Sequence, residues 1–539
     1  MSRARRADKP SYARGGRRAK RRPMLTRRAF VASASAAASA LAAPAILRSQ
    51  TLWRAYPFSL GVASGDPSPD GFVIWTRLAP EPLEPGGGMP MGVVPVTWEV
   101  SSDERFGTIV ARGEAPARPE LAHAVHVEVA GLQSDRPYFY RFSQGGERSI
   151  RGRARTLPAP GSRPAALRFG VAGCQNYEDG LFTAFGHLAR EDLAFVYHYG
   201  DYIYEYRGDP LRPGRGDPFV PVRQHAGQLL YSLDDYRRRY AQYKADPDLQ
   251  RAHAAHPFVM SFDDHEVDNN WTRDGDGEGA PPEIFALRRQ AAFQAWYEHM
   301  PLRRSSLPRG PAIRAHRALR WGDLAELSIL DTRQYRTAQP CGDGFKPACP
   351  EVFARDAAVL GAEQEAWLDR NLARRDARWN VLAQQVMMMS VDRRRSADEG
   401  PAKIMNMDSW AAYEVPRQRL LNRLSGLGNA IVLTGDEHQN WAGVLHDARD
   451  RPVAAEFVAT SISSGGDGQD VRPGSDTILS NNSQLSFVND QRGYMVCDVR
   501  QEAWQTDFMV LDKVTERGGR ISRRARATVA HGTPGLTMA

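Results

Sequence analysis

Short runs of apolar or alternating residues, separated by Gly, Pro and Asp, fill the chain from about Tyr56 to Leu157. The runs are FVIWTRL, PVTWEVS, HAVHVEVAGL and YFYRFSQ. Runs of this length and period are typical of β-strands joined by tight turns. We therefore predict a small all-β sandwich over residues 52–157, with a linker at 153–164, where Pro, Gly and Arg are frequent.

From about Ala166, short apolar strands alternate with longer helical or irregular stretches. Two stretches, Glu283–Met300 and Gly361–Arg374, carry apolar residues at a spacing of three to four, which predicts helices. This order of elements predicts an α/β or α+β domain whose sheet is built from buried strands. We place this domain at residues 165–525.

Five of these predicted strands end on a polar residue. The strands and the residues that follow them are LRFGVAG before Cys174, LAFVYHYG before Asp201, PFVMSF before Asp263-Asp264-His265-Glu266, AELSIL before Asp331, and AIVLTG before Asp436-Glu437-His438. A single Asp after a strand is usually a turn residue or a helix cap. Ligands bind at the carboxyl edge of open α/β sheets, so five such endings together predict one shared site.

The residue types at these strand ends are donors for metal ions. The candidates are Cys174, Asp201, Tyr204, Asp264, His265, Asp436 and His438. A phenolate beside a thiolate favours an oxophilic, highly charged ion such as Fe³⁺, and the carboxylates suit a harder cation such as Ca²⁺ or Mg²⁺. We expect Asp201 and Tyr204 to face one point if the strand turns into a helix. Asp436 and His438, as alternate residues at a strand end, should point to the same side.

Five short motifs carry these residues: VAGCQ, GDYIYE, DDHEVDNNW, LDTRQYR and GDEH. Together with the N-terminal sandwich, they resemble the PhoD family of alkaline phosphatases, within the metallophosphoesterase superfamily, over nearly the whole chain past the leader. The last sandwich segment, LQSDRPYFYRF, also resembles an immunoglobulin or fibronectin type III domain. One departure from the family pattern is SWAAY at 409–413, where relatives commonly have Trp-Asp-Gly-Tyr, so this loop should differ in shape.

The resemblance implies a metallophosphoesterase-type β-sheet core flanked by helices and a cofactor set of Fe³⁺ with Ca²⁺. It implies that Asp201 bridges two metals and that Cys174 and Tyr204 bind the iron. The remaining ligands implied are Asp264, Asp436 and His438. Asp264 stands where the superfamily motif usually has Asn.

An exported phosphatase of this type would hydrolyse phosphomonoesters and phosphodiesters with a metal-activated hydroxide. His265 would protonate the leaving oxygen, with Glu266 or Asp268 setting its tautomer. Candidates for phosphate contact are Asn269, Asn270, Arg333 and Arg336. Arginine has a planar fork that matches two phosphate oxygens, although most arginines of this chain should lie on the solvated surface.

Charge along the chain argues against a nucleic-acid partner. The formal net charge is +8, but the first 28 residues hold 12 Lys/Arg against one acid, so +11 lies there and the remainder carries −3. The stretch Thr26–Val31, TRRAFV, precedes a weakly apolar Ala-rich run, which resembles a twin-arginine signal at residues 1–45. An ordinary secretory peptide or a short anchor is the alternative.

We therefore predict export by the twin-arginine machinery to the periplasm or the medium, with no transmembrane anchor in the mature form, because no other segment approaches 18 apolar residues. Oxidising conditions there favour a loop disulfide between Cys341 and Cys349, while Cys497 is expected in a core strand. A cysteine phosphatase is disfavoured because Gly180 stands where its phosphate-binding Arg would be.

Two other functions remain open at this point. The same metals attack diesters, so a phospholipase D-like phosphodiesterase is one alternative. The other is a cell-surface binding protein in which the sandwich docks a partner and the metal site is vestigial.

Overall fold

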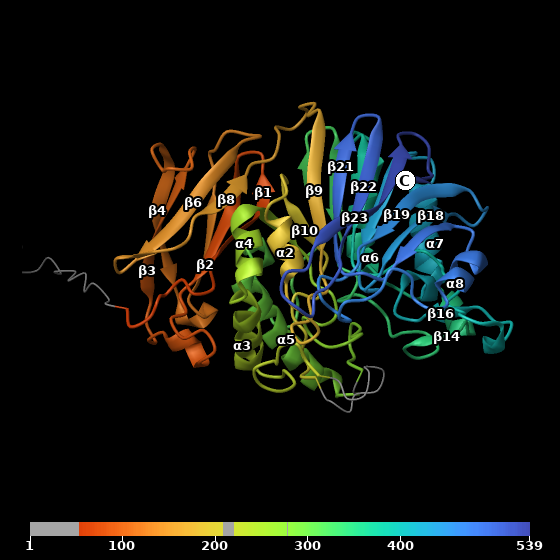
Figure 1. Cartoon of the computed structure of the whole chain (residues 1–539), viewed down its shortest axis with the longest axis horizontal. Coiled ribbons are helices and arrows are strands. Elements are labelled where there is room, and N and C mark those ends of the chain that lie inside the picture. Colours follow the sequence, from red (N-terminus) through yellow and green to blue (C-terminus); the bar gives the residue numbers. More distant parts are fainter. Residues whose placement is uncertain (1–52, 209–219, 278) are drawn as a thin grey trace, which may run out of the picture. The chain divides into compact units, whose positions relative to one another are not determined.

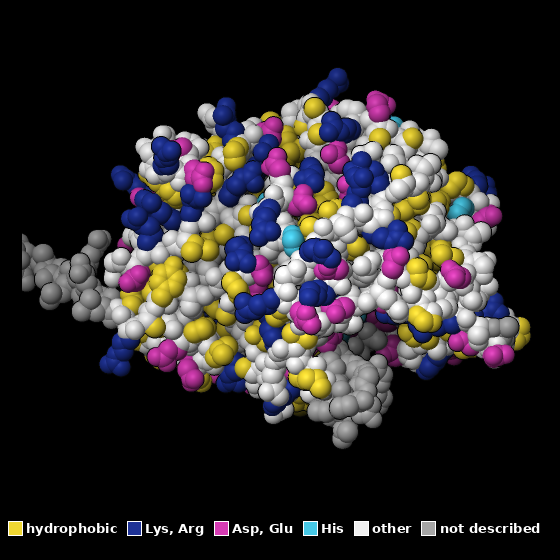
Figure 2. All heavy atoms as spheres, viewed as in Figure 1, with side chains coloured by type: hydrophobic (Ala, Val, Ile, Leu, Met, Phe, Trp, Pro, Cys, Tyr) yellow, Lys and Arg dark blue, Asp and Glu magenta, His cyan; other side chains and the backbone are white. Residues whose placement is uncertain are grey.

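The computed structural model describes residues 53–208, 220–277 and 279–539. The predicted signal peptide at residues 1–45 lies outside the described residues. Within the described part, two large sheets and their covering helices contain all the strand ends singled out above. Acidic and basic side chains are interspersed over the face shown in Figure 2, in line with a nearly neutral body.

The first sheet has ten strands. In spatial order they are β24 (Thr537–Met538), β23 (Ile521–Ala530), β22 (Ala503–Leu511), β21 (Gly493–Arg500), β9 (Ala166–Ala172), β10 (Val196–His198), β11 (Pro257–Met260), β1 (Val62–Ser68), β2 (Gly71–Arg77) and β5 (Ala124–Val129). The central strands β9, β10, β11 and β1 run parallel. Parallel strands that are buried on both faces typically have continuous apolar sequences rather than alternating ones. The sheet extends past residue 525, where we had placed the end of the domain.

The second sheet has seven strands. In spatial order they are β12 (Arg317–Trp321), β13 (Ala325–Ile329), β15 (Trp379–Ala383), β17 (Ala430–Thr434), β19 (Pro452–Val458), β18 (Asn440–His446) and β20 (Leu485–Asn489). Its centre, β13 to β19, is also parallel. The five predicted strands are therefore divided between two sheets, not gathered in one.

The two sheets pack face to face through an apolar core. Phe169 and Val171 of β9 share this core with Leu327 of β13 and Ile431 of β17, all without solvent exposure. Complete burial of one such side chain contributes about 1.5–3 kcal/mol, which makes this interface the main support of the site. Because the sheets face each other, the carboxyl ends of β9–β11 and of β13 and β17 can meet at one edge.

Helices cover the outer faces of both sheets (Figure 1). On the first sheet these are α2 (Thr183–Leu188), α3 (Leu233–Lys244), α4 (Pro247–Ala255) and α5 (Pro282–His299), and on the second α6 (Gly361–Ala373) and α7 (Glu414–Leu424). The two helices predicted from sequence, α5 and α6, are confirmed to within one residue at each end. Among the described residues, no helix combines the length and hydrophobicity needed to cross a membrane.

The N-terminal region is all β, as predicted, but one of its two layers belongs to the first sheet. Strands β1, β2 and β5 continue that sheet because β1 pairs in parallel with β11. The other layer consists of β4 (Ile109–Ala117), β3 (Val94–Ser101), β6 (Pro137–Gln144), β7 (Glu147–Arg148) and β8 (Gly152–Arg155). The layers share a core that includes Phe72, Val96 and Tyr140. Residues 153–155 of the predicted linker are part of β8.

The cysteine predictions are confirmed. A disulfide joins Cys341 and Cys349, and between them β14 (Phe345–Pro347) pairs with β16 (Ile404–Asn406). Cys497 is a fully buried residue of β21, and it and Cys174 are the free cysteines of the described residues.

Lys244, the last residue of α3, provides a test of the packing between α3 and β2. Its ammonium lies 4.1 Å from the ring centroid of Trp75, and burial lowers the pKa of Lys244 to about 7. The unfolded chain therefore binds a proton between pH 7 and about 10 that the folded chain has lost, so this lysine costs stability below pH 7 and the cost vanishes toward pH 10. We expect Lys244→Met to raise stability by on the order of 2–4 kcal/mol at pH 6, after allowing for the lost cation–π contact.

Thermal unfolding of wild type and Lys244→Met at pH 6 and pH 10 checks this expectation. The melting temperatures should differ at pH 6 and converge at pH 10. Lys513→Met, which removes an exposed lysine paired with Glu516, serves as the control and should have little effect at either pH. An equal gain for Lys244→Met at both pH values would show that the ammonium is not the cause.

Candidate metal centre

The residues predicted from the strand ends converge at the edge where the two sheets meet. Three overlapping groups of potential ligand atoms each lie within 4.8 Å: Cys174, Asp201 and His438; Asp201, Asp264 and His265; and Asp201, Asp263, Asp264 and Asp436. The loops after β9, β10 and β11 come from the first sheet, and that after β17 comes from the second. Asp201 belongs to all three groups, so it is the centre of the arrangement.

Unusual backbone conformations bring these side chains together. Cys174, Asp201, Asp436 and His438 all have positive φ, between 52° and 67°. Non-glycine residues adopt this region rarely, and such strain is typical of functional sites. Asp201 and Tyr204 do face one point, as expected, but residues 202–208 form no helix, and residues 436–438 are not an extended strand end. The chain turns sharply after each strand instead.

Glycines next to these ligands allow the loops to approach closely. A Cβ on Gly200, whose φ is +133°, would lie 2.4 Å from the backbone nitrogen of Asp263. A Cβ on Gly173 or Gly435 would lie 2.4 Å or 2.1 Å from the ring of Tyr199. The loops after β9 and β17 therefore pack on one buried ring, which fixes Cys174 relative to Asp436.

A sulfur and a phenol contact one oxygen of Asp201, and an imidazole contacts the phenol. The thiol of Cys174 lies 3.2 Å and the hydroxyl of Tyr204 2.9 Å from Asp201 Oδ2. The Tyr204 hydroxyl also lies 3.1 Å from His438 Nε2 and accepts a hydrogen bond from Ser464 Oγ at 2.7 Å. This set of donors fits an ion such as Fe³⁺, which binds thiolate, phenolate, imidazole and carboxylate.

A second group of donors consists of carboxylates. Asp201 Oδ1, Asp263 Oδ2 and Asp264 Oδ1 are buried and have no hydrogen-bond donor within the described residues. Buried oxygens without a donor are rare in proteins, and a bound cation is one reason for them. The residues present therefore fit metal ions on both sides of Asp201.

The electrostatics of the cluster lead to the same conclusion. Burial and the nearby Asp264 raise the pKa of Asp201, and burial and Asp263 raise the pKa of Asp436. Burial and Asp201 raise the pKa of the Cys174 thiol. These groups cannot all be ionised at neutral pH without added positive charge, and bound metal ions would supply it.

Part of the positive charge comes from Arg333, which is fully buried among the carboxylates. It pairs with Asp263 through Nε and with Asp408 at 2.7 Å, and its Nη2 lies 3.6 Å from Asp264 Oδ1. Although burial raises the pKa of Asp264, Arg333 and His265 hold it well below its usual value. Arg333 therefore stabilises the ionised carboxylates, and its predicted contact with phosphate stays a prediction.

Asp408 was missed by the sequence analysis. It accepts hydrogen bonds from both Arg333 and Arg336, and Arg336 is likewise buried. Asp408 immediately precedes the SWAAY segment, which was singled out only for its departure from the family pattern. Both arginines of LDTRQYR thus act inside the protein, not on its surface.

His265 is oriented by Glu205. Its Nδ1 lies 2.6 Å from Glu205 Oε2, and its ring stacks on that of Tyr204 with centroids 4.1 Å apart. Burial alone would lower the pKa of His265, but Glu205, Asp264 and Asp201 raise it well above the usual value. These carboxylates therefore favour the protonated imidazole.

The two residues predicted to orient His265 have other partners. Glu266 accepts backbone hydrogen bonds from Asp201 and Tyr202, and Asp268 pairs with Arg288 at 2.9 Å. Glu205 is the last residue of GDYIYE, so an acid four positions after Asp201 was the signal that could have identified it.

Asn270 contacts the cluster through its backbone. Its N–H donates to Asp264 Oδ2 at 2.7 Å, while its side chain donates to Asp343 Oδ2 at 2.8 Å. The exposed Asn269 donates its backbone N–H to Glu205. Side-chain contacts of both residues with phosphate stay predictions.

Asp331 does not join the cluster. Its carboxylate accepts the backbone N–H groups of Arg333 and Gln334, which makes it a turn residue. Of the five strand endings, four thus contribute to the site.

Comparison with known proteins gives consistent matches. Residues 169–508 match the family model described as PhoD-like phosphatase, and residues 42–158 match its N-terminal domain. Alkaline phosphatase D of Bacillus subtilis (strain 168) is 48% identical over 476 residues, which cover 87% of this chain and 80% of that protein. A solved structure of PhoD superposes with a TM-score of 0.86 at 46% identity, covering 90% of this chain and 93% of the other.

A more distant structure shares only the fold. Purple acid phosphatase PPD1 from yellow lupin superposes with a TM-score of 0.51 at 13% identity, covering 87% of this chain and 73% of that one. The likeness shows that this protein has the same fold of two sheets flanked by helices.

Proposed function

Because the chain belongs to the PhoD-like phosphatase family and is an alkaline phosphatase of this type, we propose that it hydrolyses phosphomonoesters and phosphodiesters at an iron–calcium centre. The observation that carries this proposal is the position of Asp201. It belongs both to a group with a sulfur and an imidazole donor and to a group of carboxylates, each within 4.8 Å, and the phenol of Tyr204 lies 2.9 Å from its Oδ2. Such a shared carboxylate is suited to bridging two different cations.

Ligand chemistry divides the cluster between the two ions. Cys174, Tyr204 and His438 offer a thiolate, a phenolate and an imidazole, and together with Asp201 they suit Fe³⁺. Asp264 and Asp436 offer oxygen ligands and suit Ca²⁺. When bound, the two cations would neutralise the phosphate oxygens and lower the pKa of water.

The protein's own residues would orient the substrate and move the proton. Glu205 holds His265 Nδ1, so Nε2 is the atom that remains to protonate the leaving oxygen. Arg333 acts to lower the pKa of Asp263 and of Asp264 and so favours their ionised forms. The ligands themselves are largely buried, so few water molecules compete with the substrate for them.

The proposed ester range is tested with p-nitrophenyl phosphate, bis(p-nitrophenyl) phosphate and phosphatidylcholine on metal-loaded protein. We expect turnover of both nitrophenyl esters. Release of choline from phosphatidylcholine at a higher kcat/KM than either would favour the phospholipase D-like alternative. A protein that turns over none of the three would be in line with a binding protein and would contradict the proposal.

We propose export by the twin-arginine route, on the strength of Arg27 and Arg28 before Phe30. Replacing both arginines with lysines keeps the charge but removes the pair that this pathway recognises. The variant is expected to remain in the cytoplasm, as measured by phosphatase activity in separated periplasmic, medium and cytoplasmic fractions. Unchanged export of the double variant would instead support an ordinary secretory signal.

A further inference from the structure

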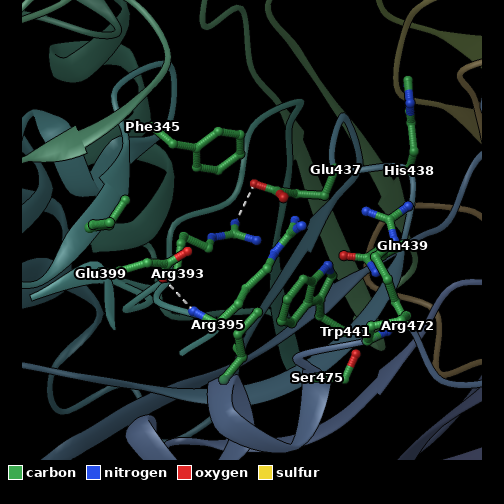
Figure 3. Close-up of a pocket in the computed structure, with 13 residues that line it drawn as sticks. Phe345, Arg393, Arg395, Glu399, Glu437, His438, Gln439, Trp441, Arg472 and Ser475 are labelled. Carbon is green, nitrogen blue, oxygen red and sulfur yellow. Dashed lines mark hydrogen bonds and ion pairs between the residues drawn. The ribbon is translucent and has the colours of Figure 1, made fainter. Parts of the chain in front are cut away.

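A pocket of about 550 Å³ lies next to the candidate metal centre. Its walls come from three segments: residues 393–404, residues 437–441 at the start of β18, and residues 472–478 at the start of α8 (Ser475–Asn481). Phe345 of β14 stands opposite and is 58% exposed (Figure 3). Apart from His438, none of the residues given a role in the proposed hydrolysis lines this pocket.

His438 borders both the pocket and the metal centre, and Glu437 lines the pocket beside it. The imidazole of His438 contacts the hydroxyl of Tyr204 on one side at 3.1 Å. On the other side Glu437 Oε1 accepts a hydrogen bond from Arg393 Nη2 at 2.6 Å. In Figure 3 the Glu437 carboxylate points toward Arg393 while the His438 side chain points away from it. The pocket therefore borders the place where a substrate would bind at the metal centre.

Three arginines line the pocket against two carboxylates. Arg393 is neutralised by Glu437 and lies over the ring of Trp441, 4.8 Å from its centroid. Arg472 is 37% exposed and uses one nitrogen to pair with Asp490 at 2.7 Å. Arg395 donates its backbone N–H to Glu399, but its guanidinium has no partner among the described residues. The positive charge available to a ligand therefore comes from the guanidinium of Arg395 and from the nitrogens of Arg472 that do not pair with Asp490.

A glycine holds these two arginines on the same wall. A Cβ on Gly474, whose φ is +86°, would lie 2.8 Å from the Cβ of Arg395. The aliphatic stem of Arg395 therefore rests against the turn that follows Arg472, where a side chain would not fit. Two guanidinium groups from segments far apart in sequence are thus directed to one pocket.

We propose that this pocket binds a second phosphate group of the substrate, so that soluble esters with two phosphates are preferred over matched esters with one. The inference rests on the proposed hydrolysis at the metal centre and assigns its substrate class. Guanidinium groups match phosphate oxygens in geometry and charge, and Arg395 offers its full set of donors. The second phosphate would lie in the pocket while the first is hydrolysed beyond His438.

The test compares propyl phosphate with propane-1,3-diol bisphosphate, and continues with longer alkanediol bisphosphates against their matched monophosphates. Metal-loaded wild-type protein is used, and rates are corrected for the two equivalent ends of each bisphosphate. We expect kcat/KM for the bisphosphate of best length to exceed that of its monophosphate about tenfold or more, mainly through KM. Arg395→Gln and Arg472→Gln should each reduce this ratio strongly while leaving turnover of propyl phosphate unchanged.

Arg375→Gln is the matched control, because it removes an exposed arginine between α6 and β15, outside the pocket lining. This variant should keep the wild-type ratio. Equal kcat/KM for mono- and bisphosphates in wild type, or a ratio unchanged in Arg395→Gln, would overturn the inference. Failure of wild type to hydrolyse propyl phosphate would count against the proposed hydrolysis instead, and calorimetric binding of the bisphosphate to wild type and Arg395→Gln would then still decide on the pocket.

Discussion

Replacing Asp201 with asparagine is expected to reduce phosphatase turnover by on the order of 10³-fold or more. Asp201 is the residue that all three groups of potential ligands share, and one of its oxygens has no hydrogen-bond donor within the part of the chain that the structure describes. Asparagine keeps the shape of the side chain but lacks the charge needed to hold two cations. The loss should appear in kcat for p-nitrophenyl phosphate and in the metal content of the purified protein.

His187→Ala is the control for this experiment. His187 bonds the carbonyl oxygen of Gly519 through its ring and is not part of the cluster, so activity should remain within about twofold of wild type. An Asp201→Asn protein that keeps its metals and more than a tenth of wild-type turnover would contradict the bridging role.

Replacing His265 with glutamine is expected to lower turnover of alkyl phosphates by about 10²–10⁴-fold, the usual range for a general acid. The effect should be much smaller with p-nitrophenyl phosphate, because nitrophenolate leaves without a proton. The dependence on the leaving group thus separates proton donation from a structural role of the imidazole.

Glu205→Gln tests how His265 is kept protonated. Glu205 raises the pKa of His265, so in wild type the imidazole stays protonated to higher pH and the acid form is lost only on the alkaline side. Removal of this carboxylate should move the alkaline limb of the pH profile for an alkyl phosphate to lower pH by about 1–2 units. An alkaline limb at the wild-type position would show that Glu205 does not set the protonation of His265.

The convergence of the strand-end residues could be predicted from the sequence because its signal is local. A polar residue directly after a fully apolar strand is visible without knowing which strands pair, and four such endings meet at Asp201. Asp331 shows the limit of this signal, since its carboxylate binds the backbone of its own turn. Asp331 and Asp201 are the same type of residue at the same position after a strand. Only the path of the chain after the strand distinguishes them.

Non-local features could not be predicted in this way. Buried strands have the same apolar pattern whichever sheet they join, so the division into two sheets and the pairing of β1 with β11 were not visible. Asp408 and Glu205 lie in irregular segments, where no periodicity marks them. Their roles depend on partners 75 and 60 residues away in sequence, Arg333 and His265.

The most direct test of the iron–calcium centre is elemental analysis, together with the visible absorption spectrum, of protein exported by its own signal. We predict about one iron ion per chain together with calcium, and a charge-transfer band that is lost or strongly shifted in Tyr204→Phe and Cys174→Ser. Active protein that contains no iron and shows no such band would contradict the account.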